Sequence, residues 1–597
     1  MHRSLPLAVV FLALASCAHP IAPTPAPVPA SAPPATRRPE VRPPIVALRP
    51  GADRVQHLMD SLSVRDKVAQ LIMPWIAGGY EPIDSPEMTQ ALMWVDSLHV
   101  GGIIMSIGSP TEVAAKLNAL QRAAPLPLIV ASDLEGGTTL RLTGGTPFPT
   151  QMGIGAAGRP DDAYQMGRIT AIEGRAVGIH WAFAPDADVN SNPDNPVINT
   201  RSFGGDPQAV ARMVIAAVHG IQDNGMYATV KHFPGHGDTE TDSHLSLPTI
   251  TAGWARFDSV EFVPFRAAIA AGVDAVMSAH IATPALDPGQ ERPGTLSPPI
   301  LTGILRDSLH FGGIVTTDAL NMGAIVKEVG ADEAPVLAFL AGSDLLLMPS
   351  DVGRAIDAMV AAVESGRISR ARLDQSVRKI LEMKARLGLF DQREVDLNRV
   401  SSVVDRADFR AIGQDVTQRS LTLLKDSLGL VASLRATPRP VTVLTAADPG
   451  SALGTTLSAE LRRKGFTVRQ LLLPLLADSA TRDSVLRLVD PSRPVIIAAS
   501  VRVTTGKGTI AMPMSAQIAI TTLAARQPTL LVSFGSPYLI SQVPDVGSYL
   551  LAWSGTATGE TAVANALTGA APITGHSPIL VPGGGPIGSG LQLGAVP

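Results

Sequence analysis

The sequence holds a single cysteine, and beyond its first seventeen residues no apolar stretch reaches the length of a transmembrane helix. One cysteine excludes a disulfide within the chain. The lack of a long apolar stretch predicts a mature protein that does not span a membrane. The chain also has no basic stripe, because its net charge is −4 and both signs are spread along it. Nucleic acid is therefore not an expected partner.

Length and composition favour a folded protein of two domains. At 597 residues the chain exceeds the size at which a single core stops growing, about 250 to 300 residues. Hydrophobic residues make up 45% and charged residues 17%, and there are 54 glycines and 50 prolines. This composition is typical of a compact, loop-rich α/β protein rather than a disordered one.

The first seventeen residues, MHRSLPLAVVFLALASC, predict an export signal, because His2 and Arg3 precede a short apolar run. The run ends in LASC, which resembles the bacterial lipobox and makes Cys17 the predicted lipidation site. An ordinary signal-peptide cysteine is the alternative. Residues 18–53 follow, and their eleven prolines up to Pro50 favour an extended spacer. We expect a soluble mature protein that is tethered in the cell envelope, at the periplasmic face or the outer membrane.

Seven apolar runs of strand length alternate with helix-like stretches in residues 54–390: HVGGIIMS, LPLIVASD, HWAFAPDADV, MYATVKHF, VDAVMSAH, GGIVTTDAL and SDLLLMP. This alternation predicts a parallel (β/α)8 TIM-like barrel, whose chemistry belongs on the loops after the strands. A connector is expected at 391–440. A smaller α/β sandwich domain is expected at 441–569, with strands VTVLT, PVIIAASV, TLLVSFG and YLLAWS, and a Gly/Pro-rich tail at 570–597.

The densest group of reactive side chains lies in KHFPGHGDTETDSHLSLP, which begins at Lys231 directly after the strand MYATV. Such density after a barrel strand indicates a functional site. A solvated polar loop is one alternative. A zinc site is another, with His232, His236, Asp242 and His244 as ligands, but neither HExxH nor CxxC is present and the charge of Lys231 opposes a cation.

This segment resembles the signature loop of the N-acetylglucosaminidase (β-hexosaminidase) branch of glycoside hydrolase family 3. The resemblance implies that His244 is the general acid/base and that Asp242 orients it. Physically, the carboxylate fixes the imidazole tautomer and stabilises its protonated form. Histidine can then protonate the leaving oxygen and later accept a proton from water.

A second segment, GIVTTDALNM, is an apolar strand that ends in Asp318. From the local pattern alone, this carboxylate is either an N-cap of the next helix or a group in the barrel mouth. Within the resemblance, the strand matches the family's nucleophile strand. Asp318 is then the residue that attacks the anomeric carbon in a retaining mechanism.

Two further segments carry the expected sugar-binding residues. SDLEGG with Arg141 resembles the family's sugar-binding turn, although Leu134, Thr138, Thr139 and Leu140 depart from its commoner wording, and RSFG matches another family segment. By this analogy Asp133, Arg141, Arg201, Lys231 and His232 bind the terminal sugar, whereas the Glu in the turn is interpreted as structural. No cofactor and no metal are implied.

The resemblance covers roughly residues 54–390 and continues more weakly through ATGETAVANALTG. Glu560 lies in that stretch. In the β-glucosidase branch of the family the acid/base comes from the second domain, so Glu560 is the alternative acid. We interpret Glu560 instead as a helix-start residue. The predicted function is a retaining exo-hydrolase of terminal β-N-acetylglucosamine in peptidoglycan-derived or other amino-sugar glycans. Alternatives are a phosphorylase, a β-glucosidase of the same family, and a glycan-binding lipoprotein without turnover.

Overall fold

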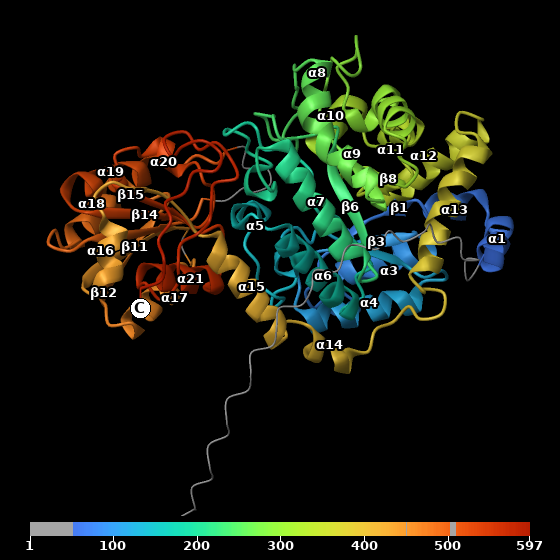
Figure 1. The fold of residues 1–597 in the computed structure, drawn as a ribbon. Coiled ribbons are helices and arrows are strands. Elements are labelled where there is room, and N and C mark those ends of the chain that lie inside the picture. Colours follow the sequence, from blue (N-terminus) through green and yellow to red (C-terminus); the bar gives the residue numbers. More distant parts are fainter. Residues whose placement is uncertain (1–51, 449, 502–508, 597) are drawn as a thin grey trace, which may run out of the picture. The chain divides into compact units, whose positions relative to one another are not determined.

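The computed structural model describes residues 52–448, 450–501 and 509–596 (Figure 1). The predicted signal peptide with Cys17 lies outside the described residues, as does the proline-rich segment up to Gly51. In the described ranges no helix combines the length and apolar character needed to cross a membrane.

The first domain is a closed barrel of parallel strands with eight positions around the ring. Strands β2 to β8 form one sheet in sequence order, β9 pairs with β1, and an isolated bridge joins Thr316 to Leu345 between β8 and β9. The predicted TIM-like barrel is therefore confirmed. Its strands are β1 (Ile72–Met73) continuing as β2 (Trp75–Ile76), β3 (Gly102–Met105), β4 (Ile129–Ser132), β5 (Trp181–Ala182), β6 (Tyr227–Phe233), β7 (Ala275–Ser278), β8 (Ile314–Thr316) and β9 (Leu346–Leu347).

Helices connect these strands, and several begin at an N-cap that the sequence marks. Asp206 accepts a hydrogen bond from the backbone N–H of Ala209, and Pro207 occupies the first turn, where its missing N–H costs nothing. The helices of this domain are α1 (Ala52–Ser61), α2 (Val64–Ala69), α3 (Pro86–Leu92), α4 (Pro110–Ala123), α5 (Gln151–Ala157), α6 (Pro160–Ala176), α7 (Pro207–Gln222), α8 (Trp254–Arg256), α9 (Phe262–Ala270), α10 (Gly323–Val329), α11 (Glu333–Ala341), α12 (Val352–Glu364) and α13 (Arg370–Arg386), with short 3-10 or π turns at Met93–Ser97, Thr138–Leu140, Asn199–Arg201, Phe257–Glu261, Gly294–Leu296 and Pro299–Ser308.

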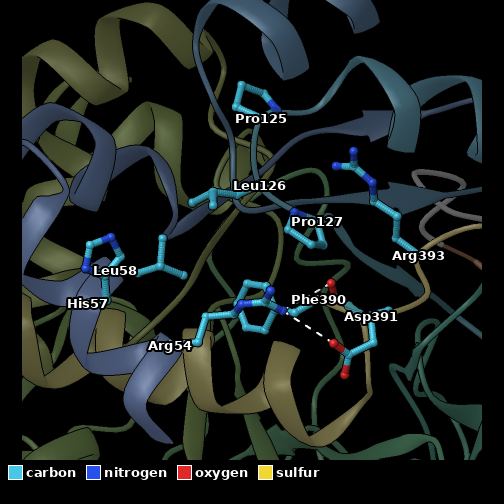
Figure 2. Close-up of a pocket in the computed structure, with 10 residues that line it drawn as sticks. Arg54, His57, Leu58, Pro125, Leu126, Pro127, Phe390, Asp391 and Arg393 are labelled. Atoms are coloured by element: carbon cyan, nitrogen blue, oxygen red, sulfur yellow. Dashed lines mark hydrogen bonds and ion pairs between the residues drawn. The ribbon is translucent and has the colours of Figure 1, made fainter. Parts of the chain in front are cut away.

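A small cavity of about 370 Å³ lies between α1, the segment 125–127 that leads into β4, and residues 389–393 (Figure 2). Arg54 donates to the carbonyl of Phe390 at 3.2 Å and to Oδ1 of Asp391 at 3.4 Å. The cavity is thus at the amino end of β4, the end at which barrels carry stability rather than chemistry. None of the predicted site residues lines it.

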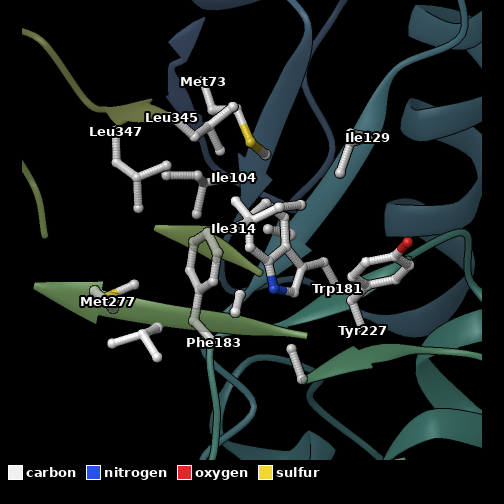
Figure 3. Packing of buried hydrophobic residues seen from close by; sticks show 14 of the residues in the cluster. Met73, Ile104, Ile129, Trp181, Phe183, Tyr227, Met277, Ile314, Leu345 and Leu347 are labelled. Atoms are coloured by element: carbon white, nitrogen blue, oxygen red, sulfur yellow. The ribbon is translucent and has the colours of Figure 1, made fainter. Parts of the chain in front are cut away.

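Large apolar side chains fill the interior of the barrel, as Figure 3 shows for Met73, Ile104, Phe183 and Leu347. Trp181 is fully buried among them, with its ring 5.2 Å from that of Phe183 in an edge-to-face arrangement. A buried indole N–H needs an acceptor, which Thr229 Oγ1 supplies at 2.6 Å. The interior is a packed core, so a ligand can bind only above it.

The second domain is a smaller α/β sandwich around a six-stranded sheet in the order β10-β15-β14-β13-β11-β12, with β10 antiparallel to its neighbour. Alternate residues of β13 pack into two separate cores, Val495 and Ile497 on one face and Ile496 and Ala498 on the other, so helices cover both faces. The predicted fold class is confirmed. The strands are β10 (Thr422–Asp426), β11 (Pro440–Ala447), β12 (Thr467–Pro474), β13 (Val495–Ala499), β14 (Thr529–Ser533) and β15 (Ser548–Leu551).

The segment expected as a connector contains α14 (Leu397–Val403), α15 (Ala407–Ser420) and the edge strand β10. The helices of the second domain are α16 (Leu430–Ala436), α17 (Thr455–Arg463), α18 (Ser479–Leu488), α19 (Met514–Arg526), α20 (Leu539–Gln542) and α21 (Ala557–Leu567). In the tail that follows, Ile573 pairs with Leu593 and Leu591 with Leu423 as isolated bridges.

Candidate active site

One pocket of about 970 Å³ lies at the carboxyl ends of the barrel strands, and all eight residues predicted to act on or bind the sugar line it. Because parallel strands bring their carboxyl ends to one rim of a barrel, residues far apart in sequence converge there. The residues are Asp133, Arg141, Arg201, Lys231, His232, Asp242, His244 and Asp318.

Asp133, just beyond β4, pairs with two cations. Its Oδ1 lies 3.0 Å from Nζ of Lys231, and its Oδ2 lies 3.1 Å from Nη2 of Arg141. Burial alone raises the pKa of Asp133, but Lys231 and Arg141 more than offset this, so its pKa lies below the ordinary value. The carboxylate therefore stays ionised and can accept hydrogen bonds from sugar hydroxyls.

Glu135 makes ion pairs in the pocket that the sequence did not predict. Its carboxylate forms a forked pair with Arg201, with Nε 2.8 Å and Nη2 2.9 Å from its two oxygens, and its Oε1 lies 2.5 Å from Nζ of Lys231. Burial raises the pKa of Glu135, but Arg201 and Lys231 hold it well below its usual range. Glu135 thus positions both cations of the predicted sugar-binding cluster.

His232 is fixed from two sides. Its Nδ1 lies 2.8 Å from Oδ2 of Asp188, and Nη2 of Arg201 lies 3.2 Å from its Nε2. Asp188 also accepts the backbone N–H of His236 at 2.7 Å, so one buried carboxylate orders the strand end and the loop after it. These contacts orient the imidazole edge that lines the pocket.

Ligand atoms of Asp186, Asp188 and His232 lie within 4.8 Å of one another, a spacing that a metal ion could bridge. Two features of the surroundings oppose a cation there. Nδ1 of His232 already bonds to Asp188, and Nε of Arg201 lies 3.4 Å from Asp186 Oδ2. Burial raises the pKa of Asp186 well above its ordinary value, which favours a neutral carboxyl rather than a metal ligand.

Asp318 follows β8 and stands at the rim of the pocket, half-buried. Its Oδ1 accepts the backbone N–H of Ala319 at 2.7 Å. Burial raises the pKa of Asp318, but His280, His232 and that N–H outweigh it, so the pKa lies well below that of an ordinary aspartate. His280 is fully buried and its Nε2 lies 2.9 Å from the carbonyl of Ala319. Asp318 is therefore an ionised, oriented carboxylate, as a nucleophile must be.

His244 and Asp242 form a dyad on the loop after β6. Nδ1 of His244 lies 2.7 Å from Oδ1 of Asp242, whose side chain is 2% exposed, whereas the imidazole is 31% exposed. Asp242 Oδ1 also accepts the backbone N–H of His244 at 2.9 Å. Because Nδ1 faces the carboxylate, Nε2 is the nitrogen left for a ligand, and the dyad has the geometry of an oriented acid/base.

The dyad loop is docked on the segment that follows the predicted nucleophile. Nζ of Lys327, in α10, donates to the carbonyl of Leu245 at 2.7 Å. A Cβ at Gly323 would lie 2.9 Å from the carbonyl oxygen of His244, so only glycine permits this close approach. The fold therefore couples the position of the dyad to the chain that carries Asp318.

His236, one of the candidate zinc ligands, is engaged within the loop. Its Nδ1 lies 2.8 Å from Oγ1 of Thr239 and its Nε2 lies 3.1 Å from Oγ of Ser243. Burial, together with the nearby His232, lowers the pKa of His236 to about 4. A neutral ring that is hydrogen-bonded at both nitrogens supports the loop.

Glu560 lies in the first turn of α21, where a helix-start residue was expected, and is 3% exposed. Its Oε2 accepts the backbone N–H of Leu457 at 2.7 Å, which caps the start of α17 inside the second domain. Glu560 is absent from the residues that line the pocket.

The pocket also has walls that no sequence pattern predicted. Residues 534–535 and 553–556 of the second domain line it, together with the apolar side chains of Trp75, Leu140 and Met348 from the barrel. Trp75 and Leu140 are 43% and 42% exposed. The only available signal was the weak family resemblance of the stretch around Glu560, which says nothing of contacts between domains.

Comparison with known proteins gives consistent matches. The model of the glycosyl hydrolase family 3 N terminal domain matches residues 63–383. A β-N-acetylglucosaminidase/β-glucosidase from Cellulomonas fimi is 31% identical over 507 residues, covering 81% of this chain and 88% of that protein. The solved structure of a family 3 β-N-acetylglucosaminidase from Paenibacillus sp. str. FPU-7 has 33% identity and a TM-score of 0.76, covering 87% of this chain and 99% of that one. A β-glucoside phosphorylase structure has 26% identity and a TM-score of 0.80 over 88% and 96% of the two chains.

Proposed function

The chain belongs to glycosyl hydrolase family 3 and is a glycoside hydrolase, and on that premise we propose that it removes terminal β-linked N-acetylglucosamine with retention of configuration. The observation that carries the proposal is the Asp242–His244 dyad in the same pocket as the ionised Asp318. The names of the Cellulomonas and Paenibacillus proteins support the amino-sugar substrate.

In the first step, an oxygen of Asp318 attacks the anomeric carbon and the bond from that carbon to the leaving oxygen breaks. The Nε2 proton of His244 passes to the leaving oxygen, and the carboxylate of Asp242 stabilises the imidazolium before the transfer. The product of this step is a glycosyl ester on Asp318 and a neutral His244.

In the second step, His244 accepts a proton from water as the water oxygen attacks the anomeric carbon, and the ester bond to Asp318 breaks. Asp133, Lys231 and Arg201 hold the sugar hydroxyls through both steps, and Glu135 keeps the two cations in place. The sugar leaves in the β configuration, and the carboxylate and the protonated imidazole are restored.

Phosphate in place of water is the second candidate acceptor. A histidine acid/base, unlike a glutamate, does not repel an incoming phosphate anion, and the similarity to a β-glucoside phosphorylase favours testing it. Phosphorolysis would yield a sugar 1-phosphate, whereas hydrolysis would yield the free sugar. The two reactions differ only in the acceptor of the glycosyl ester.

The proposed setting is the cell envelope, with a lipid on Cys17 as anchor and peptidoglycan-derived or other amino-sugar glycans as the source of substrate. The lipobox-like LASC and the proline-rich segment after it support this.

The test is turnover of 4-nitrophenyl β-N-acetylglucosaminide beside the matching glucoside and xyloside, with and without inorganic phosphate. We expect the acetamido sugar to be preferred, the β anomer of free N-acetylglucosamine to appear first, and Asp318→Asn to abolish turnover. Faster cleavage of the glucoside would reject the substrate assignment. Release of the α anomer first would reject retention, and an absence of turnover would leave a glycan-binding protein.

A further inference from the structure

A buried histidine lies directly behind the predicted nucleophile. His280 follows β7 and is fully buried, and its Nε2 lies 2.9 Å from the carbonyl oxygen of Ala319. Asp318 and Ala319 line the pocket, whereas His280 is absent from the residues that line it. The ring therefore does not meet a bound sugar, and any part that it plays in the reaction must pass through the backbone of Ala319.

The contacts of this ring fix which nitrogen carries the proton. A carbonyl oxygen can only accept, so Nε2 of His280 is the donor to Ala319. Nδ1 lies 2.8 Å from Oγ1 of Thr295, which in turn lies 2.8 Å from Oγ of Ser278. The Thr295 hydroxyl also lies 3.1 Å from the carbonyl of Ala279, but that carbonyl already accepts the backbone N–H of Thr295. The hydroxyl of Thr295 can therefore donate to Nδ1, and that of Ser278 can donate to Thr295.

This relay of donors runs from Ser278 through Thr295 and His280 to the carbonyl of Ala319, and it needs a neutral imidazole. The three side chains of the relay are fully buried. Burial lowers the pKa of His280 by more than the nearby Asp318 carboxylate raises it, which favours the neutral ring. Each donor of the relay then has an acceptor, as buried polar groups require.

The carbonyl that His280 holds belongs to the turn that carries the nucleophile. Oδ1 of Asp318 accepts the backbone N–H of Ala319 at 2.7 Å. Ala319 is thus bound to the carboxylate through its N–H and to His280 through its carbonyl oxygen. A displacement of this turn would carry the carboxylate with it, and a misplacement of about 1 Å at a reacting group can cost roughly a hundredfold in rate.

The ring of His280 lies on the side of the turn where the strand ladder stops. Toward β9, the N–H of Leu320 donates to the carbonyl of Leu347 at 2.9 Å, so backbone bonds hold the turn there. Toward β7, the paired register of β7 and β8 ends at Met277 and Thr316. The side chain of His280 therefore continues, beyond the last backbone pair, the attachment of the turn to β7.

We propose that His280 is a positioning residue for the nucleophile, because through the carbonyl of Ala319 it holds the Asp318 carboxylate in place for attack on the anomeric carbon. This inference rests on the proposed function, since it takes Asp318 as the attacking group. It differs from a purely structural role in one respect. The rate of attack should depend on a donor at the place of Nε2, and not on the mere filling of the buried space.

The experiment compares His280→Gln with His280→Asn. Both replacements are neutral amides, but only the longer glutamine can bring an N–H to the place of Nε2. The substrate is a 2,4-dinitrophenyl glycoside, whose leaving group needs little protonation, so that the attack by Asp318 is measured. His280→Asn should lower kcat/KM by about ten- to a hundredfold and slow the labelling of Asp318 by a fluorinated sugar by the same factor. His280→Gln should recover most of both losses.

Two controls separate positioning from damage to the fold. Calorimetric binding of N-acetylglucosamine should change by less than about twofold in either variant, with one site per chain, because the predicted sugar-binding cluster lies on other strands. The matched control is His180, which is 3% exposed before β5 and whose Nδ1 accepts the N–H of Val130 at 3.1 Å. The same two substitutions at His180 should alter Tm but leave kcat/KM within about twofold.

Equal losses in His280→Gln and His280→Asn, or no loss in His280→Asn, would overturn the positioning role. The ¹⁵N NMR spectrum of histidine-labelled protein, with His280 assigned by its absence from His280→Gln, should show a proton on Nε2 alone at neutral pH. A ring protonated at both nitrogens would overturn the relay.

The same experiment distinguishes a failure of this inference from a failure of the proposed function. The kinetic comparison uses the dinitrophenyl glycoside of the sugar that the unmodified protein cleaves fastest, so a wrong sugar assignment would leave the role of His280 standing. Labelling at a residue other than Asp318 would reject the proposed nucleophile and this inference with it. Labelling at Asp318 that is equally fast in all variants would reject the role of His280 alone.

Discussion

Asp242→Asn isolates what the charge behind His244 contributes. Asparagine has nearly the same shape, and its side-chain oxygen can still accept the backbone N–H of His244, now 2.9 Å from Asp242 Oδ1. The loop should therefore keep its course. What is lost is the negative charge 2.7 Å from Nδ1, in a side chain that is only 2% exposed and so poorly screened by solvent.

The size of the effect follows from that contact. A hydrogen bond to a charged group is worth about 1.5–3 kcal/mol, which corresponds to roughly 10- to 150-fold in rate. The loss should appear in full only when the leaving oxygen needs a proton. We expect kcat/KM for methyl β-N-acetylglucosaminide to fall by about this factor, and that for a 2,4-dinitrophenyl glycoside, which departs with little protonation, to fall by less than about threefold.

The assay is a leaving-group series measured for the unmodified protein, Asp242→Asn and His244→Ala. The slope of log kcat/KM against the pKa of the leaving alcohol should steepen for both variants, and more for His244→Ala. Added azide should speed His244→Ala on the activated substrate, because an anion can attack the glycosyl ester without a base. Equal losses across the series would make His244 a sugar-binding residue and would refute the acid/base assignment.

Three further expectations concern single residues. Asp318→Ala should lower turnover by about three orders of magnitude or more, and a fluorinated N-acetylglucosamine analogue should label a peptide that contains Asp318; a labelled peptide elsewhere would reject the nucleophile. Cys17→Ala should leave activity intact but move the protein from the membrane to the soluble fraction, so persistent membrane association would reject lipidation. Burial raises the pKa of Asp186 in the folded protein above its pKa in the unfolded chain. The stability of the fold therefore decreases as the pH rises from the unfolded-state pKa to the folded-state pKa, because the buried carboxyl resists ionisation. Asp186→Asn should accordingly raise Tm by about 2–4 °C at pH 8 and by less at pH 5, and an equal shift at both values would contradict the raised pKa.

Seven of the eight barrel strand positions follow from apolar runs that end in polar residues, and the missed one has a physical reason. Pro74 interrupts the first run, LIMPWI, and divides that strand into β1 and β2. A proline inside an apolar run argues against a central strand. Strand β12 was missed for a different cause, since it lies at the edge of its sheet, where four of its eight residues are exposed and only one is buried.

The residues of the candidate site followed from motifs, but the ion pairs between them did not. The family resemblance is confirmed, and it named the residues that converge in the pocket. Glu135 was interpreted as structural because a single sequence does not reveal that its partners lie 66 and 96 positions further on, at Arg201 and Lys231. Only closure of the barrel brings these charges together. The exposure of Trp75 is likewise a property of packing that its sequence neighbours do not reveal.

The second domain contributes to the site by holding the barrel loop that carries Arg201. The carbonyl of Trp553 accepts the backbone N–H of Thr150 at 3.0 Å, at the start of α5, and the side chain of the next residue, Gln151, donates to the carbonyl of Arg201. On the other side of that loop, the tail carbonyl of Pro578 accepts the N–H of Gly205 at 2.9 Å. Arg201 is thus fixed between two contacts that originate after residue 550. The second domain and the tail therefore help to hold the loop whose Arg201 forms the forked pair with Glu135, even though every predicted catalytic group belongs to the barrel.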